Sequence, residues 1–261
     1  MATEQQNAKV TLYWLDKSRS HRILWLLEEL KIDYELKVFK RTKDKLAPPE
    51  LKEVHPLGKS PVVGIQAPGI DKPIMLAESG AITEYLTEYF GKWLIPTRYA
   101  EGKEGQVGGE TEAWIRYRFL MHYAEGSIMP LMVFSLLLYS MTPVIKTAPV
   151  PFFIKPITKA IAGRVEGGFL EPNFKTHLTF LEEQLTTSGG DYLCGKDITA
   201  ADILMSYPLE AATIRAGLTK EKYPKLHAYI DRMHEREGFK KANQKIKEVT
   251  GQEYDPNIFN A

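Results

Sequence analysis

Polar residues that could bind a ligand lie at three points in the first eighty residues, each beside an expected strand or helix. The turn 16–20 reads DKSRS, the pair Ser60-Pro61 opens a strand, and Glu78-Ser79 precedes an amphipathic helix. Hydroxyl groups and cations stabilise anions through hydrogen bonds and charge. The free N–H groups at a helix N-terminus also favour an anion. The start of the helix after Glu78-Ser79 is therefore suited to an anionic group.

Each of these points also has a purely structural interpretation. A proline that opens a strand has no N–H to donate, so it can simply make a rigid turn. Ser79 can cap the helix that follows, with Glu78 as a favourable charge at the positive end. In the turn 16–20, Ser20 is the better helix cap, and the charge of Lys59 can simply be solvated. The residue types alone leave both interpretations open.

The cysteine and histidine content argues against redox and metal chemistry. Cys194 is the single cysteine, which excludes an intramolecular disulfide, a CxxC pair and a zinc site with two or more cysteines. Its surroundings, DYLCGKD, predict a small buried side chain and not a nucleophile. The six histidines show no HxxxH or HExxH spacing, so we expect no metal site.

The elements that position these residues begin with a region of mixed periodicity. In the first ninety residues the apolar pattern alternates between the strand and helix periods, in the order βαβαββα. The expected strands are residues 9–15, 34–39, 61–65 and 73–76, and the expected helices are residues 18–31, 48–54 and 78–90. We therefore expect an α/β domain over residues 9–91.

A glycine-rich linker follows, and the rest of the chain is expected to be helical. Residues 91–110 hold five glycines, which places a linker at 92–109. Helical periodicity recurs in residues 111–123, 127–140, 173–185, 200–216 and 223–237. Residues 141–156 contain four prolines and are predicted to form an irregular insertion. We expect an all-α helical bundle over 110–250 and a tail over 251–261.

The segment ITAAD, residues 198–202, is a capping box at the start of one of these helices. Thr199 caps the helix, Asp202 reaches back to the backbone, and Ile198 packs against Ile203. We therefore assign Asp202 to folding and not to a site.

Composition and charge exclude several classes of protein. Of 261 residues, 44% are hydrophobic and 26% are charged, which is typical of a folded soluble protein. The net charge is +1, without the positive excess that nucleic acid binding needs. The start of the chain shows no secretory signal, and the single cysteine suits a reducing compartment. We expect a cytoplasmic location and no nucleic acid partner.

Residues 127–145 form an apolar stretch without a charged residue that is nearly long enough to cross a membrane. Pro130, Pro143 and four serine or threonine residues favour a buried helix followed by an apolar loop. Residues 129–153 could instead make a membrane contact surface, so membrane association stays open as an alternative.

Four segments together resemble the glutathione transferase family. They are LYWLDKSRSHRILWLLEEL, HPLGKSPVV, LAESGAITEYL and GKDITAADILMSYPL, and the resemblance covers about residues 9–240. The first of them is especially similar to the fungal and bacterial branch of the family. Members have a thioredoxin-like N-terminal domain followed by an all-helical C-terminal domain. The resemblance implies the same fold here.

The resemblance also implies a role for each polar point in binding glutathione. In the family the proline that matches Pro61 is cis and exposes the main chain of the residue before it, here Ser60, to the cysteinyl backbone of glutathione. The groups that match Glu78 and Ser79 hold the γ-glutamyl amine and carboxylate. Lys59 matches a position that often helps to hold the tripeptide. These five residues are the expected glutathione site.

The turn 16–20 faces the glutathione sulfur in the family, where the chemistry needs a thiolate. A thiol of pKa about 8.5 is only about 3% ionised at pH 7, and lowering that pKa by two units takes about 2.7 kcal/mol. One hydrogen bond to the anion, worth about 1.5 to 3 kcal/mol, and a helix N-terminus, worth about 0.3 to 1, reach that range. By its match to serine-type members, Ser18 is the expected catalytic hydroxyl, with Ser20, Arg19 and Tyr13 as alternatives.

The resemblance further implies a second substrate and a partner. The helix over 110–123 lines the electrophile pocket in the family, so Tyr117, His122 and Tyr123 are candidates for it, although this aromatic stripe could equally pack the bundle. The implied function is a homodimeric glutathione S-transferase that conjugates glutathione to hydrophobic electrophiles, with peroxide reduction as a side activity. Glutathione is the co-substrate, and no metal is expected. The alternative is a non-catalytic glutathione-binding or regulatory module of the same fold.

Overall fold

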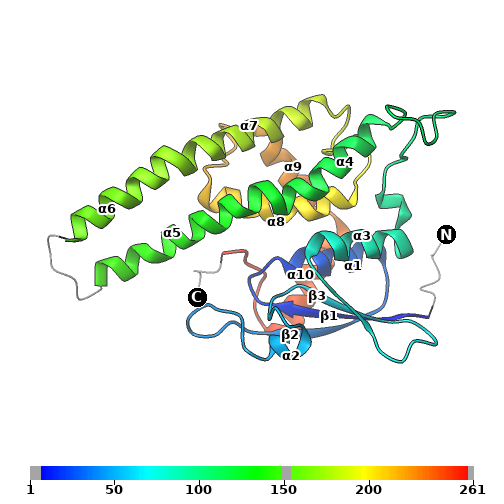
Figure 1. Cartoon of the computed structure of the whole chain (residues 1–261), viewed down its shortest axis with the longest axis horizontal. Coiled ribbons are helices and arrows are strands. Elements are labelled where there is room, and N and C mark those ends of the chain that lie inside the picture. The colour runs from blue at the N-terminus through cyan, green and yellow to red at the C-terminus, as the bar shows by residue number, and fades with distance from the viewer. Residues whose placement is uncertain (1–6, 148–153, 258–261) are drawn as a thin grey trace.

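A four-stranded sheet with its helices lies along one side of the molecule, and a bundle of longer helices lies above it in the view of Figure 1. The structure is a computed structural model that describes residues 7–147 and 154–257. The first part consists of β1 (Lys9–Leu15), α1 (Ser20–Leu30), β2 (Tyr34–Phe39), α2 (Leu51–Val54), β3 (Val62–Gln66), β4 (Ile74–Ala77) and α3 (Ser79–Phe90). This order confirms the predicted thioredoxin-like α/β domain.

The register of the sheet decides where the polar points lie. Its strand order is β2-β1-β3-β4, with β1 parallel to β2 and β3 antiparallel to both of its neighbours. Val62, the first residue of β3, is opposite Tyr13 of β1 on one side and Ala77 of β4 on the other. The start of β3 therefore lies between the end of β1 and the end of β4.

The second part is entirely helical, which confirms the predicted bundle. Its elements are η1 (Lys92–Leu94), α4 (Glu112–Tyr123), η2 (Ala124–Ile128), α5 (Met129–Thr147), α6 (Ile154–Val165), η3 (Glu166–Leu170), α7 (Glu171–Thr187), α8 (Ala200–Arg215), α9 (Pro224–His234) and α10 (Glu237–Thr250). Between the two parts, Gly102, Gly105 and Gly108 adopt positive φ angles, as a glycine-rich turn requires.

The prediction of an irregular insertion over 141–156 is wrong for the residues that the structure describes. Helix α5 continues to Thr147, and α6 begins at Ile154. Pro156 falls in the first turn of α6, where its missing N–H costs no hydrogen bond. Pro143 lies inside α5. Residues 148–153, which include the other two prolines, lie outside the described residues.

Two π-helical turns explain how the helices run on through prolines. The turn η2 ends two residues before Pro130, and η3 ends two residues before Pro172. A proline in a helix cannot donate a hydrogen bond and clashes with the carbonyl four residues earlier, and a wider turn before it relieves that clash. As a result α4, η2 and α5 form one long rod (Figure 1).

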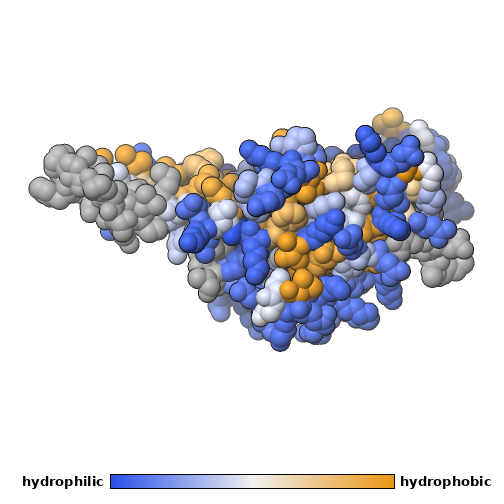
Figure 2. Space-filling model, turned by 90° about the horizontal axis from the view of Figure 1, so that it is seen from below, coloured by the Kyte–Doolittle hydropathy of each residue, from blue (hydrophilic) through white to orange (hydrophobic). Residues whose placement is uncertain are grey.

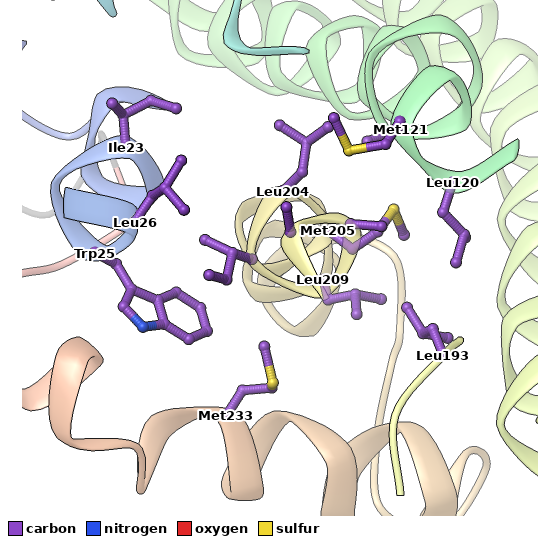
Figure 3. Close-up of a cluster of buried hydrophobic side chains, with 14 of the residues drawn as sticks. Ile23, Trp25, Leu26, Leu120, Met121, Leu193, Leu204, Met205, Leu209 and Met233 are labelled. Atoms are coloured by element: carbon purple, nitrogen blue, oxygen red, sulfur yellow. The ribbon is translucent and has the colours of Figure 1, made fainter. Parts of the chain in front are cut away.

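Helix α8 is the centre of the hydrophobic core. Figure 3 shows it end-on, with helices of both parts of the chain around it. Its buried side chains point toward residues of α1, α4, α9 and the loop before α8: Ile23, Trp25, Leu26, Leu120, Met121, Leu193 and Met233. Because α1 and α3 lie between the sheet and α8, this helix packs against both parts of the chain, and α10 also packs against α1.

The start of α8 confirms the predicted capping box. Asp202 is fully buried, and its Oδ2 accepts hydrogen bonds from the Thr199 amide at 2.8 Å and the Thr199 hydroxyl at 2.7 Å. Its Oδ1 accepts from the Leu193 amide at 3.0 Å and the Tyr229 hydroxyl at 2.8 Å. The carboxylate thus ties the start of α8 to the preceding loop and to α9.

The outer end of the helical part forms an arm. Residues 112–140 include a helical window long and apolar enough to cross a membrane, but α4 and α5 also pack against α8. Further out, α5 and α6 project from the body and carry apolar side chains (Figure 2). Phe134, Leu137, Ile157 and Ile161 are exposed there.

The last described residues pack against the sheet domain and are not a free tail. The Tyr254 ring stacks on His21 of α1 at 3.5 Å between ring centroids, and its hydroxyl donates to Glu210 at 2.7 Å. His21 Nε2 lies 2.7 Å from the Asn243 side-chain oxygen in α10. Burial lowers the pKa of His21 to about 3, so this imidazole is neutral and Nε2 donates.

We expect the substitution Asp202→Asn to lower the free energy of unfolding by about 2 to 4 kcal/mol. The reason is that an NH2 group, itself a donor, replaces one carboxylate oxygen and then faces hydrogen-bond donors. Urea unfolding measures the change. Asp197→Asn, at an exposed position of the same loop, should stay within about 0.5 kcal/mol of the parent. Equal stability of the Asp202 variant and the parent would contradict a folding role for this residue.

Candidate functional site

The sheet register brings the three polar points to one edge. Since Val62 is opposite both Tyr13 and Ala77, Ser60-Pro61 lies beside the turn after β1 and beside Glu78-Ser79. The Ser60 hydroxyl donates to the Tyr13 carbonyl at 2.8 Å. The Ser60-Pro61 peptide bond is cis, as the family resemblance implies.

Hydrogen bonds hold the turn 16–20 in place. The Ser18 Oγ lies 2.8 Å from the Leu15 carbonyl oxygen and 2.7 Å from the Ser20 Oγ. The Ser20 hydroxyl lies 3.0 Å from the same carbonyl, and its oxygen accepts from the Leu15 amide at 3.0 Å. The predicted role of Ser20 as helix cap is wrong: α1 begins at Ser20, and the Ser18 Oγ accepts the Ser20 amide at 3.2 Å. The Ser18 side chain, and not that of Ser20, therefore accepts a hydrogen bond from the first turn of α1.

Glu78 has a backbone conformation that most residues avoid. Its φ is 69°, in the region that favours glycine, and it immediately precedes α3. The prediction that Ser79 caps this helix is wrong by one residue: α3 begins at Ser79, and neither Glu78 nor Ser79 makes a side-chain cap bond there. The Glu78 side chain is exposed and Ser79 is buried, with its amide in the first turn of the helix. A carboxylate and a helix N-terminus therefore lie together.

A cavity of about 420 Å³ opens beside the turn and Ser60. Helix α5 provides an apolar wall, and the loop after β2 together with the outer end of α8 provides cationic side chains. The described residues that line it are Leu15, Ser18, Arg19, Arg41, Asp44, Lys45, Leu46, Ala47, Lys59, Ser60, Met129, Met132, Val133, Leu136, Leu137, Ser140, Tyr207, Ala211 and Arg215. Glu78 and Ser79 lie outside this lining, further along the sheet edge.

Arg41 fastens the loop after β2 to the turn after β1. Its guanidinium donates to the carbonyls of Asp16 at 3.0 Å, Lys17 at 3.0 Å and Lys45 at 2.8 Å. Burial lowers its pKa from the usual value, although a guanidinium stays charged at neutral pH. This latch keeps one side of the cavity in a fixed shape.

A partly buried ion-pair cluster that the sequence analysis did not identify supports the turn from the helical side. Glu125, in the π-helical turn η2, accepts from Arg19 at 2.6 Å and also from Arg22. Arg22 is 1% exposed and donates to the Leu204 carbonyl at 2.7 Å. The signal in the sequence was Pro130, since the wide turn before this proline contains Glu125.

The aromatic residues predicted for an electrophile pocket lie elsewhere. Tyr117 is buried beside α3, His122 is exposed, and the Tyr123 hydroxyl lies 2.5 Å from His177 of α7. Tyr13, an alternative for catalysis, lies against Phe39 with ring centroids 6.4 Å apart. None of these four is among the residues that line the cavity. The apolar wall beside the turn belongs to α5 and not to α4.

The structure confirms the predicted buried position of Cys194. Its side chain is 3% exposed, and burial raises the pKa of its thiol. Among residues 7–147 and 154–257, no three His, Cys, Asp or Glu side chains gather in a way that could hold a metal ion.

The fold and the edge site together define a class of protein. The N-terminal domain of glutathione S-transferases matches residues 8–88, and a C-terminal domain of glutathione S-transferases matches residues 150–245. The chain belongs to the glutathione S-transferase family.

Two fungal relatives and a solved bacterial structure show how far the similarity extends. The chain is 31% identical to glutathione S-transferase 3 of Schizosaccharomyces pombe, over 92% of this chain and 89% of the relative. It is 29% identical to glutathione S-transferase 1 of Saccharomyces cerevisiae, over 91% and 95% of the two chains. A glutathione S-transferase structure from Actinobacillus pleuropneumoniae aligns with a TM-score of 0.64 at 28% identity, covering 95% of each chain.

We expect Glu125→Gln to cost about 3 kcal/mol or more of unfolding free energy, because it leaves the buried Arg22 charge without its partner. Arg19→Gln removes the other, partly exposed cation and should cost no more than about 1 kcal/mol. Urea unfolding of both variants measures this asymmetry. Equal losses of unfolding free energy in the two variants would contradict the claim that Glu125 stabilises the protein mainly through the buried Arg22 charge.

Proposed function

We propose that this protein is a glutathione S-transferase that joins the glutathione thiolate to hydrophobic electrophiles. The observation that carries the proposal is the sheet register, which brings the cis Ser60-Pro61 bond, Glu78-Ser79 and the turn 16–20 to one edge beside a cavity. Membership in the family supports glutathione as the ligand. Peroxide reduction by the same thiolate is a proposed side activity.

Each point on the edge suits one part of glutathione. The backbone of Ser60, at the end of the sheet, can pair with the cysteinyl backbone as an added strand. The Glu78 carboxylate can bind the γ-glutamyl amine, and the N-terminus of α3 at Ser79 can bind its carboxylate. An extended tripeptide then directs its glycine carboxylate the opposite way, toward Lys59 and Lys45 on the cavity side.

Hydrogen-bond accounting favours Ser18 over Ser20 as the thiolate donor. Ser18 lines the cavity, whereas Ser20 is fully buried and does not. Both hydroxyls lie within bonding distance of the Leu15 carbonyl. When the Ser18 proton turns to the sulfur, Ser20 can keep that carbonyl bonded, so the change leaves no buried acceptor unpaired. Arg19 adds a cation beside the same turn.

A non-catalytic glutathione-binding module is the second candidate function. The observation in its favour is that the Ser18 hydroxyl already has hydrogen-bond acceptors within the turn. Its proton is therefore not directed toward a glutathione sulfur in this structure. A conjugation assay with 1-chloro-2,4-dinitrobenzene separates the two candidates. Turnover by the pure protein above the uncatalysed rate supports the enzyme, and glutathione binding without turnover supports the module.

We further propose that the protein works as a homodimer in the cytoplasm. Exposed apolar side chains on α3, η1 and α4 support an interface that a second copy of the chain would cover. Tyr89, Trp93, Ile115 and Phe119 are each about half exposed there. Light scattering should give the mass of two chains. A membrane contact through the α5–α6 arm is the alternative, and flotation with lipid vesicles tests it.

Glu78→Ala should weaken glutathione binding about 10 to 150-fold, because it removes a charge-assisted hydrogen bond to the ligand amine. Calorimetry measures the affinity. Glu84→Ala is the matched control, since Glu84 is on the same helix but pairs with Arg118 of α4 at 3.0 Å. Unchanged affinity in a folded Glu78 variant would remove this carboxylate from the site.

Ser18→Ala should raise the pKa of bound glutathione by about one to two units, since each unit corresponds to about 1.36 kcal/mol of thiolate stabilisation. Thiolate absorbance against pH is the readout, with Ser20→Ala as the matched control. Conjugation at pH 7 should fall about 10 to 100-fold and recover partly as the pH rises. A titration that shifts in the Ser20 variant and not in the Ser18 variant would identify the other hydroxyl as the donor.

A further inference from the structure

Cationic side chains outnumber acidic ones in the lining of the cavity. Five cations and one carboxylate are among the described residues that line it: Arg19, Arg41, Lys45, Lys59 and Arg215, with Asp44. Arg19 is paired with Glu125, and Asp255 acts electrostatically on Arg215. In the proposed site, only the glycine carboxylate and the thiolate face this lining, because the γ-glutamyl end lies at Glu78. The lining therefore suits an anionic group of the second substrate better than a cationic one.

That charge is concentrated on one face of α8. Tyr207, Ala211 and Arg215 are four residues apart, so they form a single stripe, and all three line the cavity. The small Ala211 leaves room between the phenol and the guanidinium. Arg215 is half-buried and lies toward the outer end of α5, where it also borders two neighbouring cavities. Its Nη2 donates to Asn257 at 3.3 Å.

The phenol of Tyr207 is a hydrogen-bond donor in this stripe. Burial raises its pKa and Glu210 adds to that shift, while Arg41, Arg215 and Arg19 lower it. The net shift is upward, so the hydroxyl keeps its proton at neutral pH. A neutral donor near these three guanidinium groups suits a carboxylate and not a cation.

The opposite wall is apolar. Met129, Met132, Val133, Leu136 and Leu137 of α5 contribute it, over about two turns of helix. An apolar ring or chain on this wall lies between the turn 16–20 and the stripe on α8. The cavity therefore offers a second substrate one apolar side and one anion-binding end.

We propose that the electrophile is an amphipathic anion, with its apolar body on α5 and its carboxylate bound by Arg215 and Tyr207. This inference rests on the proposed function, because the thiolate must come from glutathione in the same cavity. With an aryl chloride the sulfur forms a bond to the ring carbon, and chloride leaves with the electron pair of the broken bond. The carboxylate takes no part in the bond changes and serves only to orient the ring.

A matched pair of substrates tests the proposal. 4-Chloro-3,5-dinitrobenzoate and 4-chloro-3,5-dinitrobenzamide differ in charge and share shape and leaving group. We expect kcat/KM, divided by the uncatalysed rate constant, to be at least about 10-fold higher for the acid. Arg215→Gln should lower that value about 10 to 100-fold for the acid and less than about threefold for the amide. Lys222→Gln, an exposed cation outside this cavity, is the charge control and should leave both substrates unchanged.

The two glutathione conjugates of these substrates provide a readout that needs no turnover. Calorimetry should show that the acid conjugate binds at least about 10-fold more tightly than the amide conjugate, and that Arg215→Gln removes the difference. This binding preference without turnover of either substrate would uphold the anion site and overturn the proposed conjugation. Turnover of both substrates without a preference would uphold conjugation and overturn the anion site. Absence of both turnover and binding would overturn both.

Discussion

The buried guanidinium of Arg22 is the interaction on which the arrangement of the site depends. It is on α1, three residues after Arg19, and it donates to Glu125 in η2 and to the Leu204 carbonyl in α8. Burial lowers its pKa to about 9, which still leaves the group charged at neutral pH. One side chain thus connects the sheet domain, the long α4–α5 rod and the core helix. The turn 16–20 leads directly into α1. The position of this turn relative to the helical wall therefore follows from the contacts of Arg22.

The geometry of the rod has its own local cause. Pro130 cannot continue a regular helix without a clash, and the π-helical turn that accommodates it contains Glu125. Beyond the proline, α5 supplies the apolar wall of the cavity. A single sequence feature therefore accounts both for the carboxylate that pairs with Arg22 and Arg19 and for the wall opposite α8.

Much of the fold could be predicted from the sequence because its local signals agree. The strands β1 and β2 have the predicted bounds, and Thr199 and Asp202 form the predicted capping box. Prolines misled the prediction in 141–156, because their effect depends on their position within a helical turn. Pro156, in the first turn of α6, costs no hydrogen bond.

The site residues could be predicted from the sequence only where adjacent residues of the chain form the binding feature. Ser60-Pro61 and Glu78-Ser79 each act through a local backbone feature, a strand start and a helix start. Arg215 reaches the cavity, and Glu125 reaches Arg19 and Arg22, only through tertiary packing, which no periodicity reports. The same reason explains Tyr117 and Tyr123, whose helical spacing fits a pocket or a packed bundle equally well. Tyr117 contacts Thr87 of α3, and Tyr123 contacts His177 of α7.

The central claim is that the edge formed by Ser60, Glu78 and the turn 16–20 binds glutathione with its sulfur at the turn. A crystal structure of the protein with glutathione tests this most directly. We expect the cysteinyl backbone to pair with Ser60, the γ-glutamyl group to lie at Glu78-Ser79, and the sulfur to lie within hydrogen-bonding reach of Ser18. Glutathione bound elsewhere, or bound at this edge with its sulfur directed away from the turn, would contradict it.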